Sequence, residues 1–257
     1  MKKSILVLLG VSLLSGTLYA SGERLKGTVT DIEGNAYPTI VIGEQEWMSV
    51  NLRVTKYLDG TTIRWSIADA GNHGSSEGVC AVYPFRDIEG LTSDEQVANA
   101  YGLLYDWNVI QDNRGICPTG WRVPADEDWK ALEGFLLNNY PGVNQANIGT
   151  KLKSCKKLNS TLGEECNASS HPRWDDIILG DDPGDGTDDF GFSALPGGAR
   201  LTDGSFFGVG FLGYWWSSTE YSADYAWHRS LISGNGHLDR SYTSKELGFS
   251  VRCVRDI

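Results

Sequence analysis

The stretch Cys117-Pro-Thr-Gly-Trp-Arg-Val-Pro124 combines a cysteine, a tryptophan and residues that bend the backbone. The end of the chain repeats these ingredients, from Gly191-Phe-Ser-Ala-Leu-Pro-Gly-Gly198 through Tyr214-Trp-Trp-Ser-Ser-Thr-Glu220 to Gly248-Phe-Ser-Val-Arg-Cys253. We interpret the two regions as halves of one core, with Trp121 and Trp216 inside it, joined by a Cys117–Cys253 disulfide that closes a long loop. They indicate a fold far more clearly than a reaction.

The first 20 residues have the layout of a cleavable secretory signal. Two lysines are followed by an apolar run over residues 5–18, and Ala20 offers a small residue before a polar segment. The run is shorter than the roughly 20 residues that span a bilayer. A membrane anchor or a buried first helix is the alternative. Since the first cysteine is Cys80, we expect no lipoprotein anchor. The prediction is a secreted, periplasmic or cell-surface protein without a transmembrane span in its mature part.

Composition narrows the class of partner. The net charge is −11, and removal of the two lysines in the signal makes it −13. A chain this acidic is not expected to bind nucleic acid or anionic membrane through its overall field. The remaining length, residues 21–257, suits one domain with a sizeable core.

Five cysteines in an exported chain predict disulfides. Cys155 and Cys166 flank a short polar loop and form a plausible second pair beside Cys117–Cys253. Each bridge is expected to contribute roughly 2–5 kcal/mol, with the larger share from the longer loop. Cys80 is left over. A buried free thiol is the expected state, and a reactive or intermolecular thiol is the alternative.

The pattern of apolar residues predicts an α+β chain with a strand-rich end. Apolar spacing indicates a helix within residues 93–109, with Ser93 as its cap. A clearer helix follows Pro124: Trp129, Leu132 and Leu136 share one face, and the acidic residues 126–128 suit its positive N-terminal end. The predicted strands are 27–30, 37–42, 45–48, 215–217, 226–232, 238–242 and 249–254.

Several motifs resemble those of one family in the family's own order. They are Asp31–Asn35, Ile42–Met48, Asn51-Leu52, Tyr101–Trp107, Cys117–Trp121, Gly191–Gly198, Tyr214–Tyr221 and Gly248–Cys253. Together they resemble the Fibrobacter succinogenes major paralogous domain (FISUMP) over roughly residues 27–257.

This resemblance implies a C-type-lectin-like fold with short twisted antiparallel strands, one or two helices and long loops. It also implies kinship with the formylglycine-generating enzyme superfamily and an exported or surface location in Bacteroidetes-type bacteria. In that fold a disulfide joins the first helix to the last strand, in agreement with the Cys117–Cys253 pair. The Glu-Pro-Asn and Gln-Pro-Asp tripeptides of calcium-dependent lectins are absent, so calcium-bridged sugar binding does not carry over.

An insertion over residues 138–189 departs from a compact member of the family. It contains the Cys155–Cys166 loop and an aspartate-rich segment. Carboxylates this dense repel one another unless they are solvated or bind a cation such as calcium. A solvated acidic turn is one interpretation, and a calcium site is the other. The ligands would be Asp181, Asp185, Asp188 and Asp189.

The sequence contains few residue patterns that are typical of a catalytic site. The four histidines show no metal-ligand spacing, although His228 and His237 can face each other across a hairpin. The oxidase activity of the formylglycine-generating relatives needs two cysteines close together near the C-terminus, where only Cys253 lies. We therefore expect a protein that is not an enzyme.

A binding surface remains as the functional hypothesis. Of Trp215 and Trp216 at least one is expected in the core, whereas tyrosines with polar neighbours are expected at the surface. The predicted function is an exported, non-catalytic binding domain for a glycan or a surface protein. An enzyme relative of the formylglycine-generating type and a structural or adhesion protein are the alternatives. The predicted ligand-binding residues are Tyr221, Tyr225, Trp227, Asn235, His237, Arg240 and Tyr242.

Overall fold

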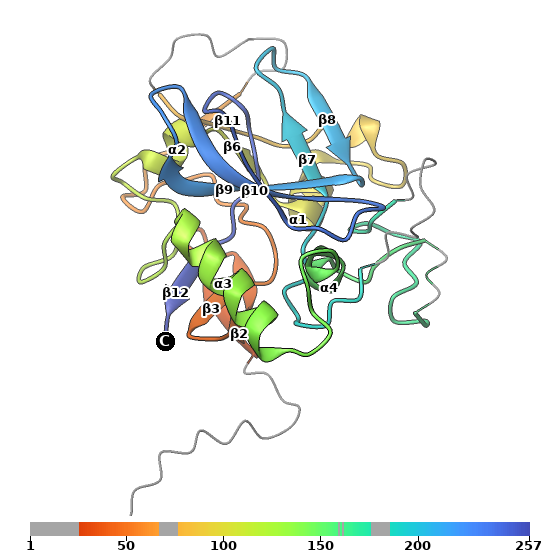
Figure 1. Ribbon diagram of the computed structural model, residues 1–257. Helices are drawn as coiled ribbons and strands as arrows, with labels where there is room; N and C mark the ends of the chain where they lie inside the picture. The colour runs from red at the N-terminus through yellow and green to blue at the C-terminus, as the bar shows by residue number, and fades with distance from the viewer. Residues whose placement is uncertain (1–25, 67–76, 159, 161, 176–185) are drawn as a thin grey trace, which may run out of the picture.

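The computed structural model describes residues 26–66, 77–158, 160, 162–175 and 186–257 (Figure 1). The expected signal sequence lies outside these residues. The described chain is α+β, as predicted, and its strands form three sheets. Among the described residues, none of the helices is both long and apolar enough to cross a membrane.

The first sheet brings the two ends of the described chain together. Strands β1 (Lys26–Thr30), β2 (Ala36–Ile42) and β3 (Gln45–Met48) form a meander, and β12 (Val254–Asp256) pairs antiparallel with β3. The glycine at position 43 turns β2 into β3 with a φ of 66°, a conformation that suits glycine. The sheet therefore contains both the first and the last strand of the described chain.

The second sheet is the larger one, with strand order β11-β10-β9-β7-β8. All of its neighbours pair antiparallel except β7 and β9, which pair in parallel. Its strands are β7 (Gly197–Arg200), β8 (Phe206–Val209), β9 (Leu212–Glu220), β10 (Tyr225–Ile232) and β11 (Asp239–Ser244). A third, small sheet contains β4 (Arg64–Trp65), β5 (Val79–Ala81) and β6 (Leu104–Tyr105).

Helix α3 (Asp126–Asn139) packs between the two large sheets (Figure 1). Its predicted apolar face is confirmed, because Trp129, Leu132 and Leu136 are fully buried. Trp129 contacts Trp47 of β3 at a ring-centroid distance of 4.8 Å. The Asp128 carboxylate accepts a hydrogen bond of 2.8 Å from the backbone N–H of Ala125 and so caps the first turn. The other helical elements are η1 (Phe85–Asp87), α1 (Asp94–Tyr101), α2 (Trp107–Gln111) and α4 (Ile148–Leu152).

The helix predicted within residues 93–109 is present, but it covers only residues 94–101 of that segment. Ser93 caps α1 as expected, accepting a 3.2 Å hydrogen bond from the Gln96 N–H, but α1 ends at Tyr101 and β6 precedes α2. Gly102 breaks the helix with a φ of 80°. A Cβ there would lie 2.6 Å from Asn51 Cβ, so this approach of two segments requires glycine.

The strand predicted over residues 249–254 is also shorter, because only Val254 belongs to β12. Phe249 and Ser250 instead form single bridges to two different strands, at Tyr105 and Trp215. The final segment thus crosses from the second sheet to the first.

Both predicted disulfides are present in the structure. Cys117 and Cys253 have Cα atoms 5.8 Å apart, and Cys155 and Cys166 have Cα atoms 5.0 Å apart. Cys80 is a free, buried thiol, and burial raises its pKa to about 12. A thiol with this pKa is protonated at neutral pH and is a poor nucleophile.

Asn51 forms a polar hub in the core. Its Oδ1 accepts hydrogen bonds from Trp215 Nε1 (2.9 Å) and Arg252 Nε (3.0 Å). Its Nδ2 donates to the Tyr101 carbonyl (2.9 Å) and to Ser250 Oγ (3.2 Å). One buried amide therefore ties together the end of α1, strand β9 and the final segment, three of the regions that carry the motifs.

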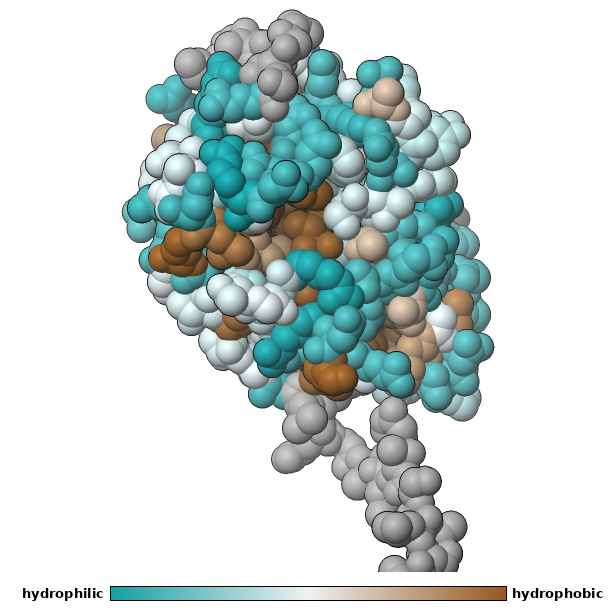
Figure 2. Space-filling model, turned by 90° about the vertical axis from the view of Figure 1, so that its left-hand side faces the viewer, coloured by the Kyte–Doolittle hydropathy of each residue, from teal (hydrophilic) through white to brown (hydrophobic). Residues whose placement is uncertain are grey.

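Both tryptophans of the β9 motif are fully buried, whereas Trp121 is partly buried against the core. The side of the molecule on the left of Figure 1 is mostly polar, with apolar patches between the polar side chains (Figure 2). Such a mixture is ordinary for a surface that faces water.

Candidate binding site

Four aromatic side chains gather at the open end of the β10–β11 hairpin. Trp227 of β10 and Tyr242 of β11 are register partners, so their side chains lie on the same face of the sheet. Tyr225 begins β10, and Tyr221 follows the end of β9, where its N–H donates to the Tyr225 carbonyl at 2.9 Å. We call these four residues the aromatic cluster.

The rings of the aromatic cluster have a defined geometry. Tyr221 and Tyr242 are stacked, with centroids 3.8 Å apart and planes 8° apart. Trp227 stands nearly perpendicular to both, at 5.1 Å and 5.6 Å, and Tyr225 is perpendicular to Tyr242 at 6.0 Å. The prediction that the three tyrosines are exposed is confirmed: Tyr221, Tyr225 and Tyr242 are 47%, 43% and 45% exposed.

Arg240 connects the aromatic cluster to helix α3. Its guanidinium carbon lies 3.4 Å from the centroid of the Trp227 ring, a cation–π contact. The same guanidinium binds both carboxylate oxygens of Asp126, with Nη2–Oδ2 at 2.8 Å and Nε–Oδ1 at 3.0 Å. Arg240 is therefore held from two sides and fixes the position of Trp227.

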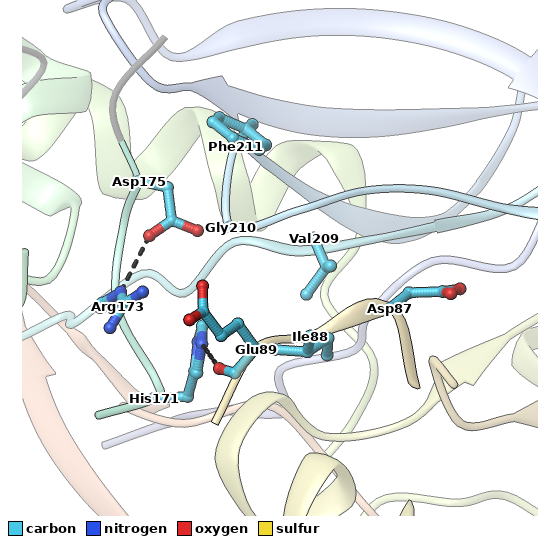
Figure 3. A pocket seen from close by; sticks show the side chains of 9 residues that line it. All are labelled: Asp87, Ile88, Glu89, His171, Arg173, Asp175, Val209, Gly210 and Phe211. Atoms are coloured by element: carbon cyan, nitrogen blue, oxygen red, sulfur yellow. Dashed lines mark hydrogen bonds and ion pairs between the residues drawn. The ribbon is translucent and has the colours of Figure 1, made fainter. Parts of the chain in front are cut away.

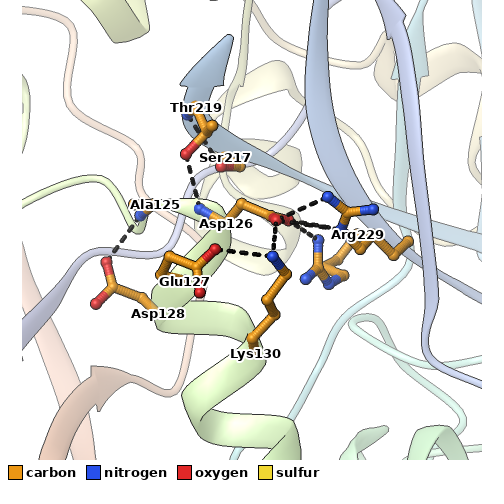
Figure 4. Close-up of polar contacts among 9 residues, drawn as sticks. Ala125, Asp126, Glu127, Asp128, Lys130, Ser217, Thr219 and Arg229 are labelled. Atoms are coloured by element: carbon orange, nitrogen blue, oxygen red, sulfur yellow. Dashed lines mark hydrogen bonds and ion pairs between the residues drawn. The ribbon is translucent and has the colours of Figure 1, made fainter. Parts of the chain in front are cut away.

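Asp126 is the centre of a charged network at the start of α3 (Figure 4). Besides Arg240, its carboxylate binds Arg229 Nη1 at 2.8 Å and Lys130 Nζ at 3.0 Å. Its N–H donates to Thr219 Oγ1 of β9 at 2.9 Å. Burial acts to raise the pKa of Asp126, but the hydrogen bonds from Arg240, Arg229 and Lys130 hold it well below its usual range. The carboxylate is therefore ionised at neutral pH.

From the sequence, Asp126 was predicted only to interact favourably with the positive N-terminal end of the helix dipole. Its two arginine partners are 103 and 114 residues away along the chain, so no local pattern predicts their contact with Asp126. One feature of the sequence could have indicated the network. Arg229 and Arg240 lie on the two strands of the predicted hairpin and are register partners in the structure. Two arginines opposite each other on one face of a sheet repel unless an acidic residue lies between them.

Asn235 and His237 do not belong to the aromatic cluster. They lie in the turn at the opposite, closed end of the hairpin, where the Asn235 side chain accepts a 2.9 Å hydrogen bond from the His237 N–H. The Asn235 carbonyl accepts from Lys153 Nζ at 2.7 Å, next to α4. The predicted set of seven ligand residues thus divides into the four of the aromatic cluster, Arg240 packed against Trp227, and two at the turn.

His228 and His237 do not face each other. The register partner of His228 is Ser241, and its ring is buried among Tyr214, Trp216 and Phe249. Burial lowers the pKa of His228 to about 4. The residue is consequently a neutral core side chain at physiological pH.

The predicted calcium ligands are only partly within the described chain. Asp181 and Asp185 lie outside the described residues. Asp188 accepts hydrogen bonds from the N–H and hydroxyl of Ser193, and Asp189 pairs with Lys151 Nζ at 2.6 Å. No group of three or more metal-ligating side chains occurs in the part of the chain that the structure describes.

A separate cavity of about 330 Å³ lies beside the turn between β8 and β9 (Figure 3). Its walls come from three segments far apart in sequence, around Glu89, His171–Asp175 and Val209–Phe211. Arg173 Nε donates to Asp175 Oδ1 at 2.9 Å, and His171 Nε2 lies 3.0 Å from the Glu89 carbonyl. The cavity was not predicted from the sequence, because none of its three segments has a motif that indicates a site.

The charged groups of this cavity largely satisfy one another. His171 Nδ1 is hydrogen-bonded to the Tyr101 hydroxyl, and burial followed by the Arg173 charge lowers the pKa of His171. Burial raises the pKa of Tyr101 above 10. Both ring nitrogens of His171 already lie within hydrogen-bonding distance of protein oxygens, and Tyr101 is a protonated phenol, so these two side chains have less to offer a ligand than the aromatic cluster.

The comparisons with known proteins give one result. The family model described as Fibrobacter succinogenes major domain matches residues 40–255. No curated protein and no solved structure matches the chain.

Proposed function

The chain belongs to the Fibrobacter succinogenes major domain family, and we propose that it is an exported, non-catalytic binding domain that recognises a glycan through its aromatic cluster. The observation that carries the proposal is the exposure of three tyrosines around Trp227 on one hairpin. Exposed aromatic rings that are grouped in this way mark binding surfaces.

The chemistry of the rings favours a glycan. Sugar rings carry apolar C–H faces edged with hydroxyl groups, and a tyrosine offers an apolar ring with a hydroxyl at its tip. Tyrosine also has few rotatable bonds, so ordering it costs little entropy. The stacked Tyr221–Tyr242 pair is already ordered, and Arg240 is fixed by Asp126. The ligand would therefore meet a preorganised surface.

The disulfides support export, because such bonds persist in oxidising compartments. We attribute residues 1–20 to a cleaved signal sequence that directs the protein to export. The mature protein would then act outside the cytoplasm, at the cell surface, in the periplasm or in the medium.

A C-type-lectin-like fold is part of the proposal. It is supported by the Cys117–Cys253 bridge, which links the segment just before α3 to the residue just before the last strand. Antiparallel pairing of β3 with β12 brings the ends of the domain together in the same region. A solved structure of the protein, compared with known folds, tests this assignment.

The proposal of a non-catalytic protein rests on the groups that are present. Cys253 is bonded to Cys117 and is not a free thiol, and the free Cys80 is buried and protonated. Neither sulfur is available for the oxidase chemistry of formylglycine-generating enzymes. Calcium remains a proposal for the aspartates of the insertion, and we expect it to be separate from glycan contact.

A glycan array tests the function directly. The mature protein, residues 21–257, is applied with calcium and again with a chelator. We expect binding to a restricted set of glycans that is the same in both conditions. Absence of binding across a broad array in both conditions contradicts the glycan proposal, and binding only with calcium contradicts the role of the aromatic cluster as the main contact.

A further inference from the structure

Tyr221 and Tyr242 are placed for a covalent reaction that needs no ligand. Their stacked rings are in van der Waals contact, with centroids 3.8 Å apart and planes 8° apart. Both side chains are nearly half exposed, so dissolved molecules reach them. A hydrogen bond with Tyr242 raises the pKa of Tyr221. The two phenol groups therefore lie side by side, ring to ring and hydroxyl to hydroxyl.

One-electron oxidation of a phenol, with loss of its proton, gives a radical whose unpaired electron occupies the π system of the ring. This electron is concentrated on the oxygen and on the carbons ortho and para to it. In tyrosine the para carbon is blocked by the side chain, so coupling of two rings occurs mainly at the ortho carbons. Stacked rings allow the two π systems to overlap before a bond forms.

We propose that Tyr221 and Tyr242 are a modification site, at which hydrogen peroxide and a peroxidase join the two rings through an intramolecular dityrosine bond. Each ring loses one electron and one proton from its hydroxyl as it becomes a radical. A carbon–carbon bond forms between the ortho carbons, and each coupled carbon then passes its hydrogen to the ring oxygen as a proton. One peroxide molecule accepts the two electrons and two protons and leaves as two water molecules.

The geometry assigns the bond to this pair rather than to its neighbours. Tyr225 is about as exposed as Tyr242 but meets it edge to face, at 6.0 Å and 87°. Perpendicular rings have little π overlap. The proposed bond would tie the outer strand β11 to the turn that joins β9 and β10 and fix the aromatic cluster in place.

The test treats the full-length mature protein, at low micromolar concentration, with horseradish peroxidase and hydrogen peroxide. We expect the intact protein to lose two hydrogen atoms in mass and to gain the blue fluorescence of dityrosine, while remaining a monomer. Trypsin releases Tyr242 in peptide 241–245 and Tyr221 in peptide 201–229, so the bond appears as a joined pair of these two peptides.

Three conservative variants identify the partners. Tyr221→Phe and Tyr242→Phe each remove one hydroxyl. We expect the yield of joined peptide to fall on the order of tenfold or more, because one of the two phenol groups that are held in position to react is then missing. Tyr225→Phe is the matched control, since Tyr225 lies in the same tryptic peptide as Tyr221, and its yield should equal that of the wild type. Joined peptide that persists in Tyr221→Phe, or disappears in Tyr225→Phe, overturns the assignment. Coupling mainly between two protein molecules overturns it as well.

Discussion

Removal of the Cys117–Cys253 bridge is expected to destabilise the protein far more than removal of Cys155–Cys166. The two bridges differ chiefly in the length of chain they close, with sequence separations of 136 and 11 residues. A cross-link restricts the unfolded chain, and the entropy it removes grows with the logarithm of the loop length. In the chain-entropy model the longer loop contributes about 5 kcal/mol and the shorter about 3 kcal/mol.

Burial adds to the difference. Cys117 and Cys253 are almost fully buried, whereas Cys155 and Cys166 are partly exposed. Replacing each buried cysteine by alanine removes the sulfur atom, and the lost packing costs about 1 kcal/mol of unfolding free energy. Cys117→Ala/Cys253→Ala should therefore lose about 6–7 kcal/mol of unfolding free energy, which approaches the whole stability of many domains. Cys155→Ala/Cys166→Ala should lose about 3 kcal/mol.

Equilibrium unfolding in urea, followed by circular dichroism and tryptophan fluorescence, measures both losses. The slope m should also rise in the first variant, because its unfolded chain exposes more surface. Cys80→Ala is the matched control: it removes a buried sulfur without a bridge and isolates the packing cost. Equal losses in the two double variants, or a larger loss for Cys155→Ala/Cys166→Ala, would show that loop length does not decide the contribution of each bridge.

Three further changes test the core. Asn51→Ala leaves two buried donors without an acceptor and should lower the free energy of urea unfolding by about 4 kcal/mol. Its control, Asn139→Ala at an exposed position, should lower it by less than about 0.5 kcal/mol. Similar losses in the two variants would contradict the role of Asn51 as a polar hub of the core. Gly102→Ala should destabilise the protein by about 3 kcal/mol, because the residue has a positive φ and a Cβ there would clash with Asn51. Gly60→Ala is the control, with a φ of 87° but no atom near its Cβ, and should cost about 1 kcal/mol. His228 binds a proton only below pH of about 4 when folded but near 6.5 when unfolded. Stability should therefore fall by about 3 kcal/mol as the pH drops through this window, and His228→Leu should remove most of that dependence; an unchanged pH profile counts against the burial of a neutral imidazole.

The parts of the fold that local pattern determines were predictable. The buried face of α3 follows from helical spacing, and both disulfides follow from the placement of the cysteines in the sequence. The exposure of Tyr221 and Tyr242 follows from their polar neighbours. In each case a few adjacent residues carry the physical cause.

The remainder depends on contacts between distant segments. Apolar spacing continues past Gly102, although a glycine is a common helix end. The close approach of Asn51 is the tertiary reason that this position requires glycine. The turn with Asn235 and His237 is drawn toward α4 by backbone bonds such as Gly149 N–H to the Gly236 carbonyl at 2.7 Å. This separates both residues from the aromatic cluster, although all seven predicted residues share one short stretch of sequence.

The role of the aromatic cluster is tested most directly by the affinity for a glycan identified on the array, measured by isothermal titration with the wild type and two variants. We expect Tyr221→Ala/Tyr242→Ala to weaken binding by about 2 kcal/mol or more, roughly thirtyfold. We expect no change for Phe207→Ala, which removes an equally large ring that is 58% exposed on strand β8, at the other edge of the sheet. Unaltered affinity in the tyrosine variant, with its fold intact by circular dichroism, would contradict the claim that the aromatic cluster is the binding site.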